Sequence, residues 1–411
     1  MQTDFLNPPI PHAIAAASHP AAPGYYRQLL EQPGIHYCPE LRMWIAAHAS
    51  DIMEIFNSPA CAVRPPAEMV PAALGSGSTA QIFQQLIRMN EGQTHATGKR
   101  ILQDCLQQLD GQRVQQTTEQ VAHRLAAALA ETQTPPASHP AQYKLSATAM
   151  NQLVRDLPLY VVAELSGCPE YLIPEIRSHI AAFVHALSKP GDAVAIAAAN
   201  QAAQALLHTF TQLAESELAA DSLLAQIHLK ARKSGGMPAE AIIANCIGLL
   251  SQTYEASRGL LQASLMYSTH YPAVFLQVLQ QPDLINDWVA EVCRLHSPVQ
   301  NTRRYVTTAT HIGNTYLPQD AVVLLLLAAA NIDTAIHEQA CEFRLQRPQR
   351  TLYSFGYGRH ACPGQQLACQ ITATATRLAG TWSLALDQWQ VSYENSANGR
   401  LPVWTHTKET A

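Results

Sequence analysis

The stretch YSFGYGRHACPG, residues 353–364, brings three glycines, a histidine and a cysteine together near the C-terminal end of the chain. Pro363 suits the first position of a helix, because the N–H that proline lacks has no partner there. Cys362 is then expected at a helix N-terminus, where unpaired N–H groups and the helix dipole stabilise a thiolate. Gly364 lets the first helical turn approach a flat ligand closely. A cysteine so placed is either a haem-iron ligand or a buried packing residue.

The spacing within this stretch favours the ligand. It resembles the cysteine-ligand loop of the cytochrome P450 family, in which Phe, Gly, a basic residue, Cys and Gly recur at fixed positions. Five residues fill these places: Phe355, Gly358, His360, Cys362 and Gly364. The resemblance implies haem b with Cys362 as the thiolate ligand of the iron and His360 near a propionate. It also implies that Phe355, Gly356 and Gly364 lie against the cofactor.

Two earlier stretches carry the same resemblance. Glu291 and Arg294 lie three residues apart on one helical face and are able to pair. They resemble the family's Glu-x-x-Arg, with Glu291 lying 71 residues before Cys362, and the resemblance implies that they fix the core beside the cysteine loop. In SPVQNTRR, Arg304 matches an arginine that reaches a haem propionate in the family, and its neighbour Arg303 is able to replace it.

The stretch THATGKR, residues 94–100, resembles the family's His-x-x-x-Arg helix at the haem edge. His95 matches, whereas Lys99 stands where arginine is usual and Arg100 lies one step further round the helix. Either cation is able to meet a propionate, although lysine offers a point charge and not a bidentate fork.

The fold class expected is mainly α with a minor β component. Residues from about 81 to 280 have helical periodicity, whereas β-branched runs and turn residues after about 300 predict short strands and a C-terminal hairpin with its tip at SANG. Residues 62–80 read as a long loop, and such loops tend to be functional. The resemblance extends from residue 24 to the end. It implies a single-domain cytochrome P450 fold over 24–411, with haem between a long central helix and the cysteine-loop helix, preceded by an extended arm at 1–23.

The central helix departs from the family where it crosses the haem. The family's oxygen-activating segment ends in an acid and a threonine, whose hydroxyl helps deliver protons to iron-bound oxygen. In SQTYEASRGLL the corresponding acid is Glu255, and Ala256 replaces the threonine. Ser257 points about 100° away from that position and cannot replace the hydroxyl. Thr253, one turn earlier on roughly the same face, is the better substitute.

Three explanations for Ala256 remain open. A substrate hydroxyl or amine organises the water, Thr253 or Glu255 serves by a shifted route, or the chemistry is not ordinary hydroxylation. The last explanation covers a peroxygenase, a desaturation or an oxidative coupling. A haem-binding sensor without turnover is the alternative from another functional class.

Composition excludes other classes of protein. A net charge of −5 and the lack of lysine and arginine blocks give no reason to expect nucleic acid. The nine cysteines include no CxxC pair, which argues against a disulfide framework or structural zinc and for a reducing cytosol. The longest apolar run, residues 321–330, is too short to cross a membrane, and the N-terminus does not resemble a signal peptide. The protein is expected to be soluble and cytoplasmic.

The function expected is therefore that of a bacterial-type haem-thiolate monooxygenase, with a plausible place in specialised metabolism. It would activate O₂ and oxidise, most simply hydroxylate, a small apolar or mixed organic substrate. Electrons would come from a separate ferredoxin or flavodoxin with its reductase, because the chain has no flavin or iron–sulfur region. The resemblance implies a substrate pocket formed by four segments: residues 62–85, 171–200, 253–256 and the tip of the C-terminal hairpin.

Overall fold

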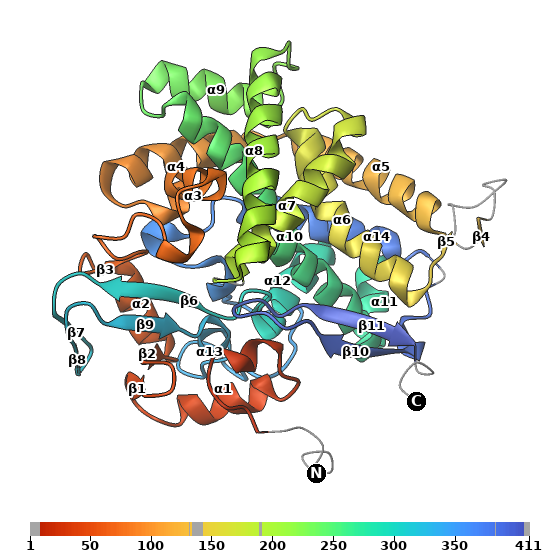
Figure 1. The fold of residues 1–411 in the computed structure, drawn as a ribbon. Coiled ribbons are helices and arrows are strands. Elements are labelled where there is room, and N and C mark those ends of the chain that lie inside the picture. Colours follow the sequence, from red (N-terminus) through yellow and green to blue (C-terminus); the bar gives the residue numbers. More distant parts are fainter. Residues whose placement is uncertain (1–8, 131, 134–142, 189–190, 383, 407–411) are drawn as a thin grey trace.

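The computed structural model describes residues 9–130, 132–133, 143–188, 191–382 and 384–406. Within these ranges helices predominate, and the largest sheet lies at one side of the molecule (Figure 1). The α-helices are α1 (Ala22–Leu30), α2 (Ala49–Asn57), α3 (Ser78–Gln85), α4 (Gly92–Gln107), α5 (Gly111–Leu129), α6 (Ala147–Leu165), α7 (Ile173–Ser188), α8 (Ala193–Glu215), α9 (Leu223–Ser234), α10 (Ala239–His270), α11 (Pro272–Gln280), α12 (Ile285–His296), α13 (Leu327–Asn331) and α14 (Gln365–Ala379). Short 3-10 helices are η1 (Ala15–Ser18), η2 (Ala72–Leu74), η3 (Ile87–Met89), η4 (Glu170–Leu172), η5 (Pro282–Leu284), η6 (Tyr353–Phe355), η7 (Gly358–His360) and η8 (Leu386–Gln388).

The strands form one mixed sheet and three hairpins. They are β1 (His36–Cys38), β2 (Met43–Ala46), β3 (Cys61–Ala62), β4 (Thr132–Gln133), β5 (Tyr143–Lys144), β6 (Thr302–Val306), β7 (Thr310–Ile312), β8 (Thr315–Leu317), β9 (Val322–Leu325), β10 (Trp389–Tyr393) and β11 (Pro402–His406). The sheet has the order β1-β2-β9-β6-β3, in which only β2 and β9 are parallel. The sheet therefore joins segments from both ends of the sequence.

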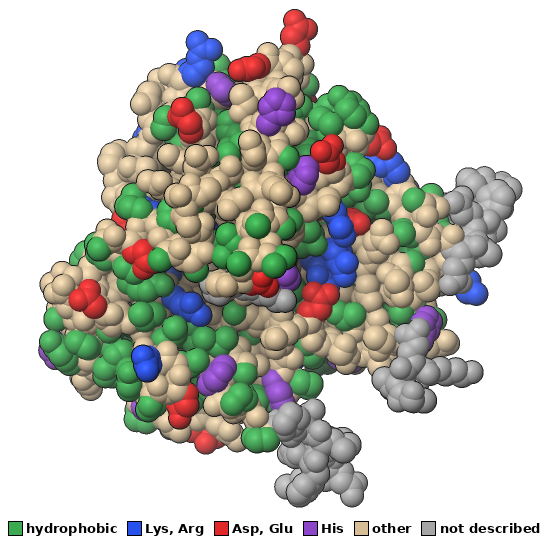
Figure 2. All heavy atoms as spheres, viewed as in Figure 1, with side chains coloured by type: hydrophobic (Ala, Val, Ile, Leu, Met, Phe, Trp, Pro, Cys, Tyr) green, Lys and Arg blue, Asp and Glu red, His purple; other side chains and the backbone are tan. Residues whose placement is uncertain are grey.

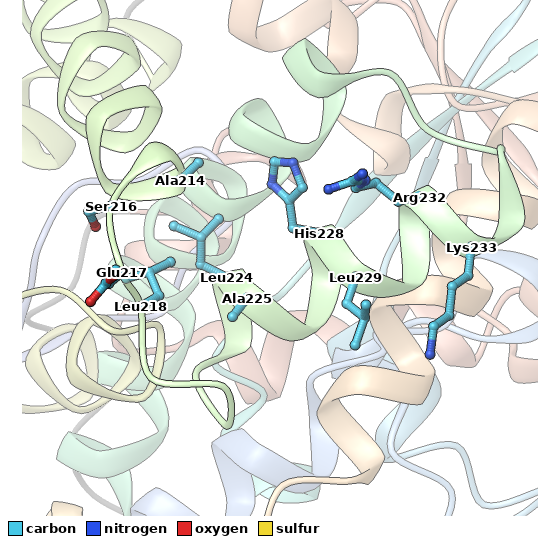
Figure 3. Close-up of a pocket in the computed structure, with 10 residues that line it drawn as sticks. All are labelled: Ala214, Ser216, Glu217, Leu218, Leu224, Ala225, His228, Leu229, Arg232 and Lys233. Atoms are coloured by element: carbon cyan, nitrogen blue, oxygen red, sulfur yellow. The ribbon is translucent and has the colours of Figure 1, made fainter.

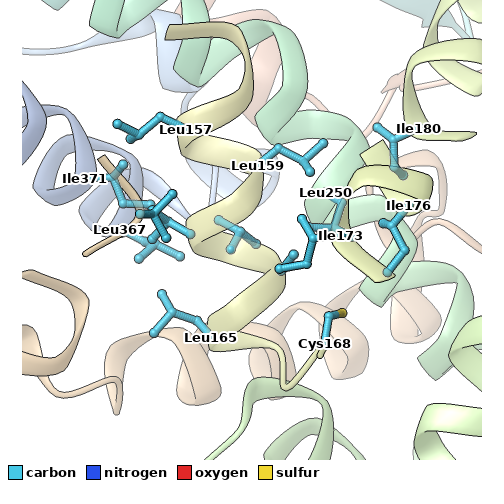
Figure 4. Close-up of a cluster of buried hydrophobic side chains, with 14 of the residues drawn as sticks. Leu157, Leu159, Leu165, Cys168, Ile173, Ile176, Ile180, Leu250, Leu367 and Ile371 are labelled. Atoms are coloured by element: carbon cyan, nitrogen blue, oxygen red, sulfur yellow. The ribbon is translucent and has the colours of Figure 1, made fainter. Parts of the chain in front are cut away.

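The 32-residue helix α10 runs through the middle of the helical region (Figure 1). Most of its residues are buried, and Pro272, the first residue of α11, follows its end. Side chains of α6, α7 and α14 pack with Leu250 of α10 in the cluster of Figure 4. This core holds α10 and α14 in place. The middle of α10 and the start of α14 carry the residues predicted for the site.

The N-terminal segment differs from the predicted extended arm. Residues 15–18 form η1, and Ala13, Ala16 and Ala17 are buried, with the first two in a cluster that includes Leu324 and Leu326. The prediction of an extended segment is wrong there, because small alanine side chains allow this backbone to pack closely against the fold. Residues 1–8 lie outside the described residues.

Most other predicted elements are confirmed. The short strands after residue 300 and the hairpin of β10 and β11 all form. The predicted loop at residues 62–80 is interrupted by η2, and α3 already begins at Ser78. Among the described helices none is long and apolar enough to cross a bilayer. Charged side chains are scattered over the face in Figure 2, in keeping with a charged fraction of 14%.

Candidate functional site

The cysteine loop is shaped by two glycines and one closing hydrogen bond. Gly356 and Gly358 have φ values of +72° and +63°, which side chains with a Cβ rarely adopt. A Cβ on Gly358 would also lie 2.5 Å from Asn57 Oδ1, so α2 packs directly against the loop. The Cys362 N–H donates to the Phe355 carbonyl at 2.7 Å and closes the loop. This geometry presents Cys362 at the start of α14.

Cys362 faces an enclosed space. The Cys362 side chain has a large accessible area, yet the protein atoms around it raise the pKa of its thiol by desolvation. A side chain with both properties lines an internal cavity. Backbone N–H groups of Gly364 and Gln365 donate to the sulfur, and they and Lys99 counteract the rise. The helix-terminal environment is as predicted, but the helix begins at Gln365. Pro363 therefore precedes the helix, and the prediction that it occupies the first helical position is wrong.

The middle of α10 forms the second wall. Gln252 is exposed and the next four residues, 253–256, are partly exposed, in a helix that is otherwise largely buried. The Thr253 hydroxyl donates to the Leu249 carbonyl at 2.8 Å. Burial raises the pKa of Glu255, whose carboxylate makes no hydrogen bond with any residue that the structure describes. Ser257 is buried, in keeping with its expected direction away from Ala256. The structure thus places Thr253, Glu255 and Ala256 together on the partly exposed stretch.

Basic groups from α4, β6 and the cysteine loop converge at one place. The rings of His95 and His360 lie 4.0 Å apart, and His360 Nε2 lies 3.1 Å from Glu91 Oε2. Lys99 Nζ donates to the Arg359 carbonyl at 2.5 Å. Arg359 donates to three carbonyls at the end of α2 and in β3, those of Phe56, Ser58 and Cys61, at 2.7–3.2 Å. These contacts bring α4 and the cysteine loop to one edge of the site.

Arg304 completes this basic cluster, which we define as His95, Lys99, Arg304, Arg359 and His360. Its guanidinium lies 4.7 Å from the centre of the Phe56 ring, and burial lowers its pKa to about 10. Arg304 Nε is buried without a hydrogen-bond partner among the described residues. Arg303, the alternative, is exposed, as the alternation along β6 requires. Arg100 is also exposed, whereas Lys99 is partly buried and bonded to the loop.

The basic cluster lacks matching negative charge. Glu91 is the carboxylate that acts on it, and although burial alone would raise the pKa of Glu91, bonding to His360 and nearby Arg359 bring it to about 2. Burial, His360 and Lys99 lower the pKa of His95 to about 4, so its imidazole is neutral at pH 7. Three permanent cations therefore face one carboxylate. A planar cofactor with a metal for the thiolate and two carboxylates for this cluster fits the residues present.

Beneath the loop, Glu291 is the centre of a buried ion network. Arg294 donates to both of its carboxylate oxygens, at 2.7 and 3.1 Å, which confirms the predicted pair. Arg347 and Arg350 also donate to Glu291, at 3.1 Å for the shortest contact of each. Asn331 connects this network to the loop, because its carbonyl accepts from Arg294 and its Oδ1 accepts the N–H of Tyr353. The network holds the segment that precedes Cys362.

Sequence reasoning missed three participants: Glu91, Arg359 and Arg347. Arg359 lies inside the quoted cysteine-loop stretch and Arg347 shortly before it, but their side chains acquire roles only through partners distant in sequence. Glu91 directly precedes α4, and this position was the available signal.

A surface groove between the end of α8 and α9 is a separate feature (Figure 3). His228, Arg232 and Lys233 of α9 line it together with Glu217. None of the residues predicted for the site lines this groove, so it does not belong to the site around Cys362.

Comparisons with known proteins agree with this geometry. The sequence profile described as Cytochrome P450 matches residues 273–377. A biotin biosynthesis cytochrome P450 of Bacillus subtilis is 27% identical over 213 residues, which are 52% of this chain and 54% of that protein. Cytochrome P450 144 of Mycobacterium tuberculosis is 31% identical over 256 residues, 62% of this chain and 57% of that protein. The matched part thus spans about half the length of these curated relatives.

Solved structures extend the likeness of the fold to nearly the whole chain. P450BioI in complex with an acyl carrier protein ligated to hexadec-9Z-enoic acid superposes with a TM-score of 0.76 at 20% identity, over 93% of this chain and 98% of that one. CalO2 superposes with a TM-score of 0.77 at 19% identity, over 93% and 96%. At these identities the likeness concerns the fold.

Proposed function

This chain belongs to the cytochrome P450 family, and on that premise we propose that it is a monooxygenase that oxidises a small organic substrate. Haem is the cofactor of the family. The observation that carries the proposal is the thiol of Cys362, which lines an enclosed space and accepts two backbone N–H bonds at the start of α14. Such N–H bonds favour the thiolate that an iron ligand requires.

The residues present fit haem, which when bound supplies the iron at which dioxygen is activated. We assign Cys362 as the iron ligand and the basic cluster as the group that holds the two propionates. Arg304, with its unpaired Nε, and the imidazole of His95 offer N–H donors to those carboxylates, whereas His360 lies beside His95 and directs its Nε2–H at Glu91. Phe355, Gly356 and Gly364 form the loop on the thiolate side, where small residues permit close approach.

On the opposite wall, residues of α10 govern proton supply. Hydroxylation consumes one dioxygen, two electrons and two protons; one oxygen atom enters a C–H bond and the other leaves as water. Ala256 offers no hydroxyl, and the Thr253 hydroxyl already donates to the Leu249 carbonyl. Glu255 carries the one carboxyl on this stretch, and its raised pKa supports a role in holding a proton. We therefore place proton supply at Glu255, assisted by a polar group of the substrate.

Replacing Ala256 with threonine tests this division of roles. We expect the ratio of product formed to reductant consumed to change, because the new hydroxyl would organise water at the place where the chain now has a methyl group. The measurement is that ratio at saturating substrate. Ser257→Ala is the matched control, because Ser257 is buried and points away from the site. An unchanged ratio in Ala256→Thr would show that the position is silent.

The monooxygenase assignment itself predicts a dependence on electron transfer. Turnover supported by a ferredoxin or flavodoxin with its reductase should exceed turnover with peroxide alone, since the reaction consumes two electrons and dioxygen. Equal or greater turnover with peroxide would favour the peroxygenase alternative. The lack of a hydroxyl at Ala256 is the reason to consider that alternative. A haem sensor would yield no product under either condition, even with ligands that change the iron spin state.

A further inference from the structure

Arg88, in η3 just before α4, is held in a fixed position. The Ile87 N–H donates to Asn245 Oδ1 of α10 at 2.9 Å, and Asn245 Nδ2 donates to the Gln85 carbonyl at 2.8 Å. Leu86 is fully buried and Ile87 nearly so. The backbone that precedes Arg88 is therefore attached to the central helix.

Two glycines make this attachment close. A Cβ on Gly98 of α4 would lie 2.4 Å from the Ile87 side chain, and a Cβ on Gly248 of α10 would lie 2.7 Å from that of Leu86. Glycine at both places lets η3 lie wedged between α4 and α10. These are the helices that carry His95 and Ala256, so Arg88 stands between the two parts of the site.

The side chain of Arg88 lines an internal space. It is exposed by area, yet burial lowers the pKa of its guanidinium, the same combination of properties that Cys362 has. Gln252 lies two helical turns after Asn245, on the same face of α10, and it is exposed as well. Ala256 also lies on this face, so the accessible stretch of α10 and the attachment of η3 at Asn245 share one side of the helix.

Within the described ranges, Arg88 has no hydrogen-bonded or ion-paired partner. Burial is the one cause of its shifted pKa, so no carboxylate acts on it. Arg88 also stands apart from the basic cluster. The pKa values of His95, Arg304 and His360 are all shifted by Glu91 and Arg359, and none of them is shifted by Arg88. The cluster already offers enough donors for two propionates. Arg88 is a further cation, outside the basic cluster, on the segment packed between α4 and α10.

We infer that Arg88 binds the carboxylate of the substrate, so that the chain acts on organic acids whose apolar part lies along α10 toward Ala256. An unpaired guanidinium in an enclosed space is costly, and an anionic ligand removes that cost. The planar fork of arginine matches a carboxylate with two parallel hydrogen bonds. This inference rests on the proposed function and names the substrate class of the same site.

The test compares acids with their methyl esters. The ligands are pairs built on straight-chain, cyclic and arylacetic skeletons, titrated against the haem-loaded protein by the change in iron spin state. In the wild type we expect acids to bind about tenfold to a hundredfold tighter than the matched esters, the range for a hydrogen-bonded charged group. Arg88→Met should abolish that preference at unchanged haem content, and Arg88→Lys should restore part of it. Arg232→Met, at the exposed end of α9, is the matched control and should keep the preference.

Each other outcome rejects the inference. Esters that bind as tightly as acids, an acid preference that survives in Arg88→Met, or a panel in which no acid binds would all contradict it. Loss of haem from Arg88→Met would assign Arg88 to a propionate instead. The carbon monoxide spectrum separates this failure from failure of the proposed function, because the thiolate band depends on Cys362 and not on the ligand panel.

Discussion

Replacing Cys362 with serine is expected to abolish the thiolate-type carbon monoxide difference spectrum of the reduced protein, together with all oxygen-dependent turnover. The serine hydroxyl has nearly the same size but remains protonated at neutral pH, so it cannot supply the anionic sulfur that the iron site requires. The N–H groups of Gly364 and Gln365 would still point at this position, because they belong to the start of α14. The loss would therefore reflect the missing ligand and not a missing loop. Haem content and the carbon monoxide spectrum are the measurements.

A second cysteine, within α14, provides the control. Cys369 lies near Cys362, but burial raises the pKa of its thiol to about 12, so it is neutral and unsuited to act as a ligand. Cys369→Ser should retain the thiolate band. A wild-type band in Cys362→Ser, or a histidine-type spectrum in freshly prepared wild-type protein, would overturn the assignment of Cys362.

Replacing Glu291 with glutamine is expected to destabilise the protein by about 3–5 kcal/mol, the usual cost of leaving a buried charge without its partner. Glu291 and Arg294 are fully buried, and the Arg347 side chain is only 3% exposed. A neutral amide cannot balance the guanidinium groups that meet at this carboxylate. Chemical denaturation of the haem-loaded protein, followed by circular dichroism and by haem release, measures the change.

Asp287→Asn is the matched control, because Asp287 pairs with Arg350 at the edge of the same network and is 41% exposed. Its loss should cost less than about 1 kcal/mol, as is usual for exposed ion pairs. Equal unfolding midpoints for the two variants would contradict the central role of Glu291.

The network also predicts how stability depends on pH. Burial alone would raise the pKa of Glu291, but bonding to Arg294 and Arg347 outweighs this and lowers it from 4.5 to about 2. Since the folded state binds this proton less readily, the stabilisation is complete above pH 4.5 and is lost as the pH falls toward 2. The difference corresponds to about 3 kcal/mol. The Glu291→Gln variant should lack this part of the acid dependence.

The part of the site that the sequence predicts consists of residues whose roles can be inferred from their spacing within a short stretch. The cysteine loop, the pair of Glu291 and Arg294, and the hairpin of β10 and β11 were accessible because each depends on a short stretch of sequence. The resemblance already preferred Arg304 over Arg303, but the physical reason needed the structure, since it depends on which face of β6 is buried. Helix α14 begins two residues after the predicted start, a difference that lies within the usual uncertainty of helix ends.

The residues that sequence reasoning did not find depend on contacts between distant segments. Arg359 is defined by carbonyls of α2 and β3, and Glu91 by its approach to His360. In the sequence Arg88 stands among apolar and amide residues, in LIRMN, so nothing in its local sequence marks it. Its role follows from where η3 is packed, between two helices that are about 150 residues apart in sequence.

The contacts of Arg359 have a consequence for the order in which the protein is made and folded. Its three carbonyl partners precede it by 298–303 residues. The ribosome therefore synthesises these carbonyl partners long before it reaches the cysteine loop, and until then they lack the hydrogen bonds from Arg359. Contacts between such distant residues form slowly, because the intervening chain must lose conformational entropy before the contact is made. We expect cofactor capture to follow completion of the chain, so the unfinished protein depends on its helical core to remain compact.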